Sequence, residues 1–485
     1  MNARTICLAI GLVIAGTAWA QPEVEWERTY GGESFDDCNS LIRTADGGYA
    51  MAGYTFSFGA GNSDFWLVRT DRNGDSLWSR TYGGVDYDIC RSLIQTADGG
   101  FAMAGGTDSF GAGDPDFWLV RTDANGDSLW SCRFGGEQFD YCNFLIQTTD
   151  GGFAMAGYTE SFGVGGGDFW LVRTDGDGDS LWSRTFGGRN EDVCYSLIQT
   201  ADGGFAMAGE SDSDFWLVRT DGDGDSLWSR TFGGEGRADR CYSFVQTADG
   251  GFAMAGESNS FSPPSYDFWL VRTDESGDSL WSSTFGGEPD DGCYSLIQTT
   301  DGGFALAGST YSFGAGEGDL WIVRTDEDGD SLWSETFGGV GRDYCTTVIG
   351  ASDGGYVLAG TIDLYDYANF YLVKTSPDPV SVRDSRSTLN PSSFNLFPAF
   401  PNPFNSMVTI PFGLDNSAPT RLAIFDPMGR RVADLIPGHP PLTPPASGEG
   451  KYSVIWDASG VPAGNYIIQL NSGNQQLMEN LSLIK

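Results

Sequence analysis

Residues Trp182 to Leu227 read WSRTFGGRNEDVCYSLIQTADGGFAMAGESDSDFWLVRTDGDGDSL, and near-copies of this stretch fill most of the chain. One cysteine marks each copy, and successive marker cysteines are 52, 52, 52, 47, 52 and 52 residues apart. The markers are Cys38, Cys90, Cys142, Cys194, Cys241, Cys293 and Cys345. A period of this size is typical of an array of identical units, each of which needs its neighbours to bury its apolar faces.

Each repeat contains four strand-length runs separated by Gly and Asp. In the quoted repeat these runs are CYSLIQT, GFAMAGE, DFWLVRT and SLWSRTF, and none shows a helical period. The turn Ala201-Asp202-Gly203 places Gly where a hairpin loop needs a left-handed residue. Within DFWLVRT, Phe215 and Leu217 point to one face while Trp216 and Val218 point to the other. A sheet that is apolar on both faces is sandwiched between neighbours, as propeller blades are.

The two ends of the repeat region predict how the array closes. VEWERTY, which begins at Val24, matches the fourth strand of a repeat, whereas the seventh repeat stops after its third strand, at Asn369–Thr375. Pairing these two strands would close a ring and remove its free edges. We therefore predict an all-β protein with a seven-bladed β-propeller of four-stranded blades, followed by a small Ig-like β-sandwich. The predicted domains are a signal peptide at 1–20, the propeller at 21–376, a linker at 377–394 and the β-sandwich at 395–485.

The first twenty residues predict export. MNARTICLAIGLVIAGTAWA carries Arg4, then an apolar run, then the small-residue cleavage site Ala18-Trp19-Ala20, as a secretory signal peptide does. No stretch is long and apolar enough to predict a transmembrane segment. In an exported chain cysteines suggest disulfides, but equivalent positions in neighbouring repeats are expected to lie too far apart for a bridge. We expect the repeat cysteines to be buried free thiols, with Cys132 the most accessible.

The charge is concentrated in the repeats. The chain has a formal net charge of −39 at pH 7, and residues 381–485 contribute seven basic and seven acidic residues to it. The whole excess of negative charge therefore belongs to residues 1–380. Such a surface repels nucleic acid and anionic lipid, so we predict no nucleic-acid partner.

Histidine chemistry is excluded from the repeats because the chain's one histidine is His439. No Ser/His/Asp triad, Cys/His pair or histidine metal site can form there, although carboxylate-pair chemistry stays open. An active site on a propeller needs different residues from different blades, and we expect nearly every polar position to recur in each repeat. We therefore predict that the protein is not an enzyme and has no catalytic residues.

Each repeat carries an aspartate two residues before its cysteine. Because residues two apart share a strand face, these carboxylates are predicted to encircle one mouth of the central channel, at the start of the innermost strands. They either cap N–H groups of the Gly-Gly loop between blades, such as Gly187-Gly188, or form a seat for a ligand or cation. The seven are Asp36, Asp88, Asp140, Asp192, Asp239, Asp291 and Asp343.

Two turns have alternating carboxylates, as an EF-hand calcium loop does at its start. The match then fails, because Ser180 and Phe186 stand where that loop needs Gly and a bidentate Glu. Plain hairpin turns and weak calcium sites are the two interpretations, and no other cofactor is predicted. The candidate metal ligands are Asp175, Asp177, Asp179, Asp221, Asp223 and Asp225.

The loop between the second and third strands reads SFGAG or a variant in most repeats. Its phenylalanine is either a stacking platform for a sugar or a folded-back anchor of the loop. The fourth repeat has a shorter loop without this residue. The phenylalanines are Phe58, Phe110, Phe162, Phe261 and Phe313, and we take Phe58, Phe110, Phe162 and Phe313 as candidate ligand-binding residues.

Two resemblances follow from these motifs. The repeats resemble the tandem DGGY…AG…D…L…TD.NGD.LW…GG propellers of exported bacterial proteins. From Phe394 the chain resembles the C-terminal sorting domain of type IX secretion cargo, through Pro401-Asn402-Pro403-Phe404-Asn405, IFDPMGRRV, Trp456-Asp457 and the terminal Lys485. This second resemblance implies the secretion machinery as a partner. It also implies a secreted or outer-surface location in a Gram-negative-type bacterium, reached through the periplasm.

The sequence thus favours a non-enzymatic propeller that acts as an interaction or adhesion scaffold, whose ligand is an unknown protein or glycan. The alternative is a multivalent, lectin-like ring that binds carbohydrate through the SFGAG loops. A second alternative is an extracytoplasmic glycosidase or lyase.

Overall fold

The computed structural model describes residues 21–378 and 395–483, apart from some short gaps. The gaps are 112, 235–236, 262–263, 364–366, 397–398, 400–406, 414–419, 427, 429, 438–450, 459, 463 and 473–474. The predicted signal peptide 1–20, most of the predicted linker, the Pro401–Asn405 motif and Lys485 lie outside the described residues. The chain divides into two compact units, with a boundary after Asp384, and we describe each unit by itself.

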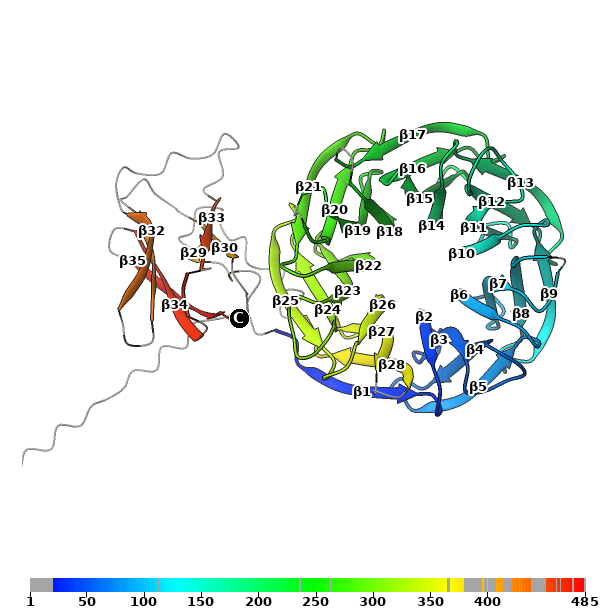
Figure 1. Ribbon diagram of the computed structural model, residues 1–485, viewed down its shortest axis with the longest axis horizontal. Coiled ribbons are helices and arrows are strands. Elements are labelled where there is room, and N and C mark those ends of the chain that lie inside the picture. The colour runs from blue at the N-terminus through cyan, green and yellow to red at the C-terminus, as the bar shows by residue number, and fades with distance from the viewer. Residues whose placement is uncertain are drawn as a thin grey trace, which may run out of the picture. The chain divides into compact units, whose positions relative to one another are not determined.

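In the first unit the described residues form seven four-stranded antiparallel sheets arranged in a ring (Figure 1). The first strand of each sheet lies nearest the centre of the ring. These strands are β2 (Asp36–Arg43), β6 (Asp88–Gln95), β10 (Asp140–Gln147), β14 (Asp192–Gln199), β18 (Asp239–Gln246), β22 (Asp291–Gln298) and β26 (Tyr344–Gly350). The second strands are β3 (Tyr49–Thr55), β7 (Phe101–Thr107), β11 (Phe153–Thr159), β15 (Phe205–Ser211), β19 (Phe252–Ser258), β23 (Phe304–Thr310) and β27 (Tyr356–Asp363).

The third and fourth strands continue each blade towards the rim (Figure 1). The third strands are β4 (Asp64–Thr70), β8 (Asp116–Thr122), β12 (Asp168–Thr174), β16 (Asp214–Thr220), β20 (Asp267–Thr273), β24 (Asp319–Thr325) and β28 (Ala368–Thr375). The fourth strands are β5 (Ser76–Tyr82), β9 (Ser128–Phe134), β13 (Ser180–Phe186), β17 (Ser226–Phe232), β21 (Ser279–Phe285), β25 (Ser331–Phe337) and β1 (Val24–Tyr30). The predicted seven-bladed propeller is confirmed.

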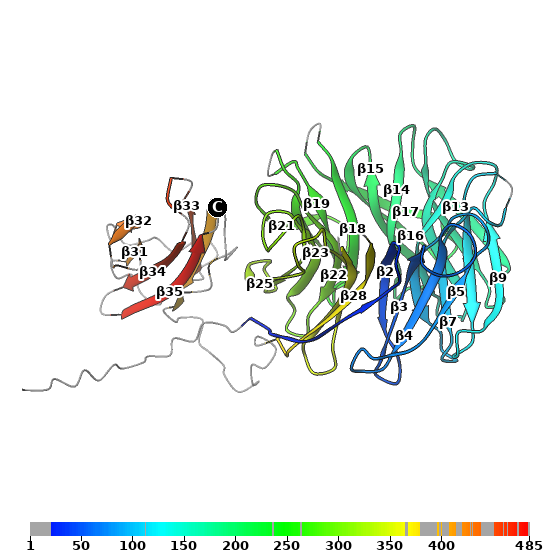
Figure 2. The ribbon, with the colours of Figure 1, turned by 60° about the horizontal axis from the view of Figure 1, so that its bottom comes forward.

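The strands run between two faces of the ring, as the tilted view shows (Figure 2). One, the loop face, carries the Gly-Gly loops between blades and the loops between second and third strands. The other, the turn face, carries the tight hairpin turns. Every first strand begins at the loop face, so the residues at its start gather there.

The N-terminal strand closes the ring as predicted. Strand β1 pairs antiparallel with β28, from Val24 opposite Thr375 to Tyr30 opposite Phe370. The seventh blade therefore has the order β1-β28-β27-β26 and combines the two ends of the repeat region. Ser376 N donates a hydrogen bond of 2.7 Å to Glu23 O, which extends this pairing beyond the strands.

Aromatic side chains join neighbouring blades. The third-strand Phe of one blade packs on the third-strand Trp of the next, as in Phe65 with Trp118, whose ring centroids are 4.6 Å apart. Six of the seven junctions have this aromatic pair in the described residues, and Leu320 and Tyr371 pack in the same cluster at the remaining one. Such pairs need apolar residues on both faces of the third strand, which explains the DFWLVRT pattern.

In each of the first six blades an arginine forms an ion pair with an aspartate at the turn face, and we call this pair the Arg–Asp clip. In blade five, Arg272 Nη2 donates to both carboxylate oxygens of Asp249, at 2.6 Å, and Asp249 also accepts hydrogen bonds from Thr247 Oγ1 and Gly251 N. The Thr247 and Arg272 hydrogen bonds lower the pKa of Asp249 to about 2. This clip ties the DGG turn to the third strand, which accounts for the recurrence of DGG. Lys374 and Asp353 replace the pair in blade seven, at 2.8 Å.

The marker cysteines are free and fully buried, as predicted, and burial raises the pKa of Cys90 and Cys345 to about 12. Cys132 is also free but only partly buried. The thiols in the blades thus act as small apolar groups between sheets.

The second unit contains two antiparallel sheets. One has the order β29-β30-β33 and the other β32-β31-β34-β35. Their strands are β29 (Asn395–Leu396), β30 (Met407–Gly413), β31 (Thr420–Phe425), β32 (Arg431–Pro437), β33 (Lys451–Asp457), β34 (Gly464–Ser472) and β35 (Gln475–Leu483). Trp456 of the first sheet packs edge-on against Tyr466 of the second, with ring centroids 5.7 Å apart. A small β-sandwich is therefore present, as predicted.

Asp378 anchors the end of the propeller. Although it falls in the segment predicted as linker, it is 1% exposed and accepts hydrogen bonds from Arg324 Nε at 2.9 Å, Trp333 Nε1 at 3.2 Å and Tyr356 Oη at 2.7 Å. Arg324 is itself fully buried, and it also binds Asp301. The residues after β28 thus hold blades six and seven together.

We predict that Asp378→Ala lowers the free energy of unfolding of the ring by about 3 kcal/mol, because it leaves the buried Arg324 guanidinium with one carboxylate instead of two. Urea unfolding followed by tryptophan fluorescence measures the change. Glu327→Ala removes the same charge from an exposed turn and should cost little. Equal stability of the two variants would contradict this role of Asp378.

Candidate functional site

The aspartates at the starts of the first strands are buried at the junctions between blades. All seven are at most 2% exposed, and each accepts a hydrogen bond from the second Gly of the preceding Gly-Gly loop, at 2.6–3.1 Å. Asp36 also accepts hydrogen bonds from Thr55 Oγ1 and from Ser57 Oγ, the latter at 2.8 Å. A ligand at these carboxylates would have to displace such bonds, and their predicted role in binding stays a prediction.

We call the aspartates at the starts of the first strands the ring aspartates. At six junctions in the described residues, a second carboxylate faces the ring aspartate. It belongs to the first residue of the third strand of the preceding blade, and a glycine lies between the two groups. A Cβ on Gly83 would lie 2.0 Å from Asp64 Oδ1 and 2.6 Å from Asp88 Oδ2. Burial, and secondarily the Asp88 charge, raise the pKa of Asp64. Only glycine fits at this position, which explains the first Gly of the loop. The pairs are Asp64–Asp88, Asp116–Asp140, Asp168–Asp192, Asp214–Asp239, Asp267–Asp291 and Asp319–Asp343.

The loop phenylalanines are anchored and still partly exposed. Phe58 lies 5.3 Å from Trp66 between ring centroids, and Phe110 and Phe162 make the same contact with Trp118 and Trp170 at 5.2 Å. These three side chains are 37–44% exposed on the loop face. Phe261 and Phe313 pack on their own third-strand tryptophans in the same way. Phe313 is 8% exposed, so the open phenylalanines lie mainly on blades one, two, three and five.

The acidic turns are closed by their own backbone. Asp175 Oδ1 accepts hydrogen bonds from Asp177 N at 3.0 Å and Asp179 N at 2.9 Å. The turn 221–225 repeats this arrangement around Asp221 Oδ1. In the described ranges no three His, Cys, Asp or Glu side chains are grouped as a metal site would require. Calcium binding at Asp175, Asp177, Asp179, Asp221, Asp223 and Asp225 stays a prediction.

The side chains that do not recur gather on the innermost strands, near the loop face. They come from the residues on either side of the marker cysteine and from the second-strand residues opposite. We call them the axial cluster. Its members are Asp37, Tyr54, Arg91, Tyr141, Tyr158, Tyr195, Glu210, Arg240, Tyr242, Glu257, Tyr294 and Tyr344.

Blades four and five contribute an ion-paired triad to the axial cluster. Arg240 Nε lies 2.8 Å from Glu210 Oε2, and Arg240 Nη1 lies 2.8 Å from Glu257 Oε1. Glu257 Oε1 also accepts a hydrogen bond of 3.1 Å from Tyr242 Oη. Burial raises the pKa of Glu210, although the Arg240 charge opposes the shift. One guanidinium therefore serves two partly buried carboxylates.

Blades seven, one, two and three contribute a second group of side chains to the axial cluster. Tyr54 and Tyr344 both donate hydrogen bonds to the Asp37 carboxylate. Arg91 lies 5.6 Å above the ring of Tyr141, which stacks on Tyr158 with centroids 6.4 Å apart. Arg91 is exposed, and its Nη1 donates a hydrogen bond of 3.4 Å to Asn39 Oδ1. This side of the cluster is a tyrosine surface that includes one guanidinium.

Two glycines that do not recur make room for these side chains. A Cβ on Gly106 would lie 2.5 Å from Tyr141 Cε2, and a Cβ on Gly292 would lie 2.9 Å from both Glu257 Oε2 and Tyr294 Oη. In blade one the corresponding positions hold Tyr54 and Asp37. The glycines are therefore paired with the larger side chains of the adjacent blade.

Our expectation that nearly every polar position recurs is wrong on the innermost strands. The residue after the marker cysteine is Asn, Arg, Asn, Tyr, Tyr, Tyr and Thr in successive repeats, while the cysteine itself never changes. That contrast was visible in the sequence. What it could not show is that these variable positions meet across blades.

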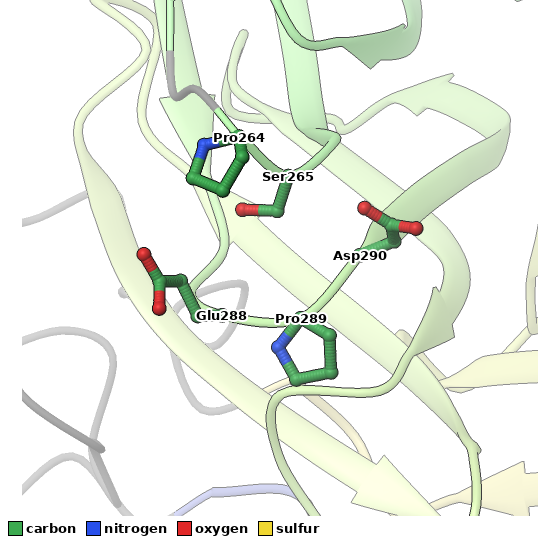
Figure 3. Close-up of a pocket in the computed structure, with 5 residues that line it drawn as sticks. All are labelled: Pro264, Ser265, Glu288, Pro289 and Asp290. Atoms are coloured by element: carbon green, nitrogen blue, oxygen red, sulfur yellow. The ribbon is translucent and has the colours of Figure 1, made fainter.

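A pocket of about 420 Å³ opens on the loop face where blades five and six meet (Figure 3). Pro264, Ser265, Glu288, Pro289 and Asp290 line it. Ser265 Oγ donates to Gly287 O at 3.0 Å, and Tyr266 N donates to Asp290 Oδ1 at 2.9 Å. The polar atoms of this pocket therefore hold the two loops together.

Comparison with known families identifies the second unit. Residues 398–484 match the secretion system C-terminal sorting domain, which confirms the resemblance seen in the sequence. The ring of seven sheets formed by the repeats makes the chain an all-β propeller protein of the tandem-repeat kind. More particularly, it is a tandem-repeat propeller that carries a C-terminal sorting domain, which indicates secretion to the cell surface or extracellular space. Among the described residues no helix has the length and apolar character needed to span a membrane.

Relatives of the whole chain are distant. The regulatory protein FlaEY of Caulobacter vibrioides is 29% identical over 187 residues, which cover 33% of this chain and 20% of that protein. The match thus spans about a fifth of the relative's length. Prolyl oligopeptidase B of Galerina marginata is 11% identical, with 81% of this chain and 56% of that chain covered and a TM-score of 0.39. A luciferin-regenerating enzyme is 8% identical, with 71% and 94% covered and a TM-score of 0.37. At such low TM-scores, neither structure informs the activity of this protein.

The carboxylate pairs predict a stability that rises on mild acidification. Burial raises the pKa of Asp291 and Asp319 to about 6, and the Asp343 charge adds to the shift at Asp319. Because the folded ring holds these protons more tightly than the unfolded chain, the free energy of unfolding increases as the pH falls from about 6 towards 4. It is lost again as the pH rises through 6. As the pH falls from about 4 towards 2, the stabilisation by the clips around Asp249 and its equivalents is lost, so we expect maximal stability near pH 4.

Asp319→Asn tests this pH dependence, because blade seven already has Asn369 at the same position. The variant should be more stable than the wild type at pH 7 by about 1 kcal/mol, and less so at pH 5. Urea unfolding at both pH values measures the difference. An unchanged pH profile would show that the Asp319–Asp343 pair does not share the raised pKa.

Proposed function

We propose that this protein is a non-enzymatic interaction or adhesion scaffold, secreted or displayed on the outer surface of a Gram-negative-type bacterium. The observation that supports it most is the division of the blades into two sets of positions. The ring carboxylates, Arg–Asp clips and Phe–Trp contacts recur and maintain the fold. The axial cluster differs from blade to blade, and its side chains are not among these recurring contacts.

The composition of the axial cluster suits binding. Tyrosine and arginine are the residues that most often dominate interface energetics, since they offer large contact areas with polar ends. The carboxylates are less suited to catalysis. Glu210 and Glu257 are bridged by the same Arg240 guanidinium, whereas a glycosidase needs one protonated and one free carboxylate on either side of the bond that it cleaves. A binding role therefore fits the geometry better than a hydrolase or lyase.

Carbohydrate binding is the second candidate. The observation that favours it is the row of half-exposed phenylalanines on the loop face, Phe58, Phe110 and Phe162, each supported from below by a tryptophan. Such rings offer open faces for sugar stacking.

Deleting residues 385–485 tests the role of the sorting domain. Because the ring has its own closing strand and its anchor at Asp378, the truncated chain should fold and remain in the periplasm. Fractionation of the host, with circular dichroism of the purified fragment, measures both outcomes. Export of the folded fragment would contradict the proposed role of the sorting domain in this protein.

A glycan array separates the scaffold from the lectin. We expect that replacing the loop phenylalanines has no effect on glycan binding by the mature protein. A glycan that is bound by the wild type and released by the Phe58→Ala, Phe110→Ala, Phe162→Ala variant would replace the scaffold with the lectin. Leu77→Ala, on the outer strand β5, serves as the control for an exposed apolar residue.

A further inference from the structure

Glu257 presents one occupied and one open carboxylate oxygen. Oε1 accepts hydrogen bonds from Arg240 Nη1 at 2.8 Å and Tyr242 Oη at 3.1 Å. Oε2 is directed towards Gly292 and receives no hydrogen bond from the residues that the structure describes. Gly292 belongs to blade six, and each of the other six blades has a residue with a side chain at this position. The space beside this acceptor is therefore a feature of one blade alone.

Tyr242 and Tyr294 lie beside the Glu257 carboxylate, and Tyr195 of the preceding blade packs on Tyr242. The ring centroids of Tyr195 and Tyr242 are 4.9 Å apart, and those of Tyr242 and Tyr294 are 5.1 Å apart. A Cβ on Gly292 would lie at the same distance, 2.9 Å, from Tyr294 Oη and from Glu257 Oε2. Aromatic faces and a free carboxylate oxygen together are the groups that bind an ammonium or guanidinium ion.

The charge around Glu257 is negative, which also favours binding of a cation. Glu210 and Glu257 share one guanidinium, so one carboxylate charge of the triad stays uncompensated. The nearby Glu191 contributes further negative charge, which adds to the burial that raises the pKa of Glu210. A net charge of −39 over the chain would also draw cations towards the ring.

We propose that Glu257, with Tyr195, Tyr242 and Tyr294, binds a lysine or arginine side chain in an extended segment of a partner protein. The inference rests on the proposed scaffold function and names the chemistry of its partner. A polypeptide fits better than a free amine, because the tyrosines extend over three blades and half-exposed phenylalanines lie on the same face of the ring. Those apolar groups would contact residues on either side of the cation.

Binding of fluorescent peptides to the mature protein tests the proposal at ~150 mM salt, where long-range attraction is screened. The probes are a lysine-containing peptide with apolar flanks and the same peptide with acetyl-lysine, which is neutral. The lysine peptide should bind at least about tenfold more tightly, and Glu257→Gln should remove that preference. Glu327→Gln, in an exposed turn, deletes the same charge and should leave it unchanged. Thermal unfolding verifies that each variant is folded.

Gly292→Ala provides a second variant if Glu257→Gln disturbs the fold. Its Cβ would meet Glu257 Oε2, so it should weaken binding of the lysine peptide without removing any charge. Equal losses in Glu257→Gln and Glu327→Gln, or equal affinity for the two peptides, would show nonspecific attraction and overturn the proposal. So would a neutral glycan that requires Glu257. If neither peptide binds while the protein still retains cells or another protein, the cation site is wrong and the scaffold function stands.

Discussion

The contact between the third-strand Phe of one blade and the third-strand Trp of the next is the constraint on which the ring depends. It recurs with centroid distances of 4.5–4.6 Å, and it requires each sheet to be apolar on both faces. A blade that is apolar on both faces cannot be stable alone, so the array must close. Closure by β1 then satisfies the last free edge without a further blade.

The same constraint brings polar groups together at the loop face. When blades pack this closely, the loop between them has room for glycine alone, and the carboxylates on either side of it become buried. Hydrogen bonds from glycine N–H stabilise the first-strand carboxylate of each pair, and burial raises the pKa of carboxyl groups at these junctions, such as Asp64, Asp291 and Asp319. The cost of these buried charges is offset by the Arg–Asp clips at the turn face, where the carboxylates are ionised and well paired.

The blades differ on the innermost strands, on either side of the marker cysteine. Each innermost strand buries its marker cysteine, whereas the residues on either side of the cysteine differ among the blades. These residues and the second-strand residues opposite them form the axial cluster, in which Tyr, Arg and Glu differ among blades. The sorting domain is a separate unit, and its presence indicates secretion.

The sequence by itself determined the ring: the 52-residue period, the two-faced DFWLVRT strand and the matching end strands define seven blades and their closure, because local patterns and strand counts carry that information. It also determined the sorting domain, through an ordered set of motifs. The tertiary structure alone decided what the polar residues do. Arg240 reaches Glu210 thirty positions away, and Gly292 opens beside Glu257, because the curvature of the ring places neighbouring innermost strands in contact. Asp378 lies in the segment predicted as linker, and its burial also depends on the tertiary structure, because its partners come from three different strands.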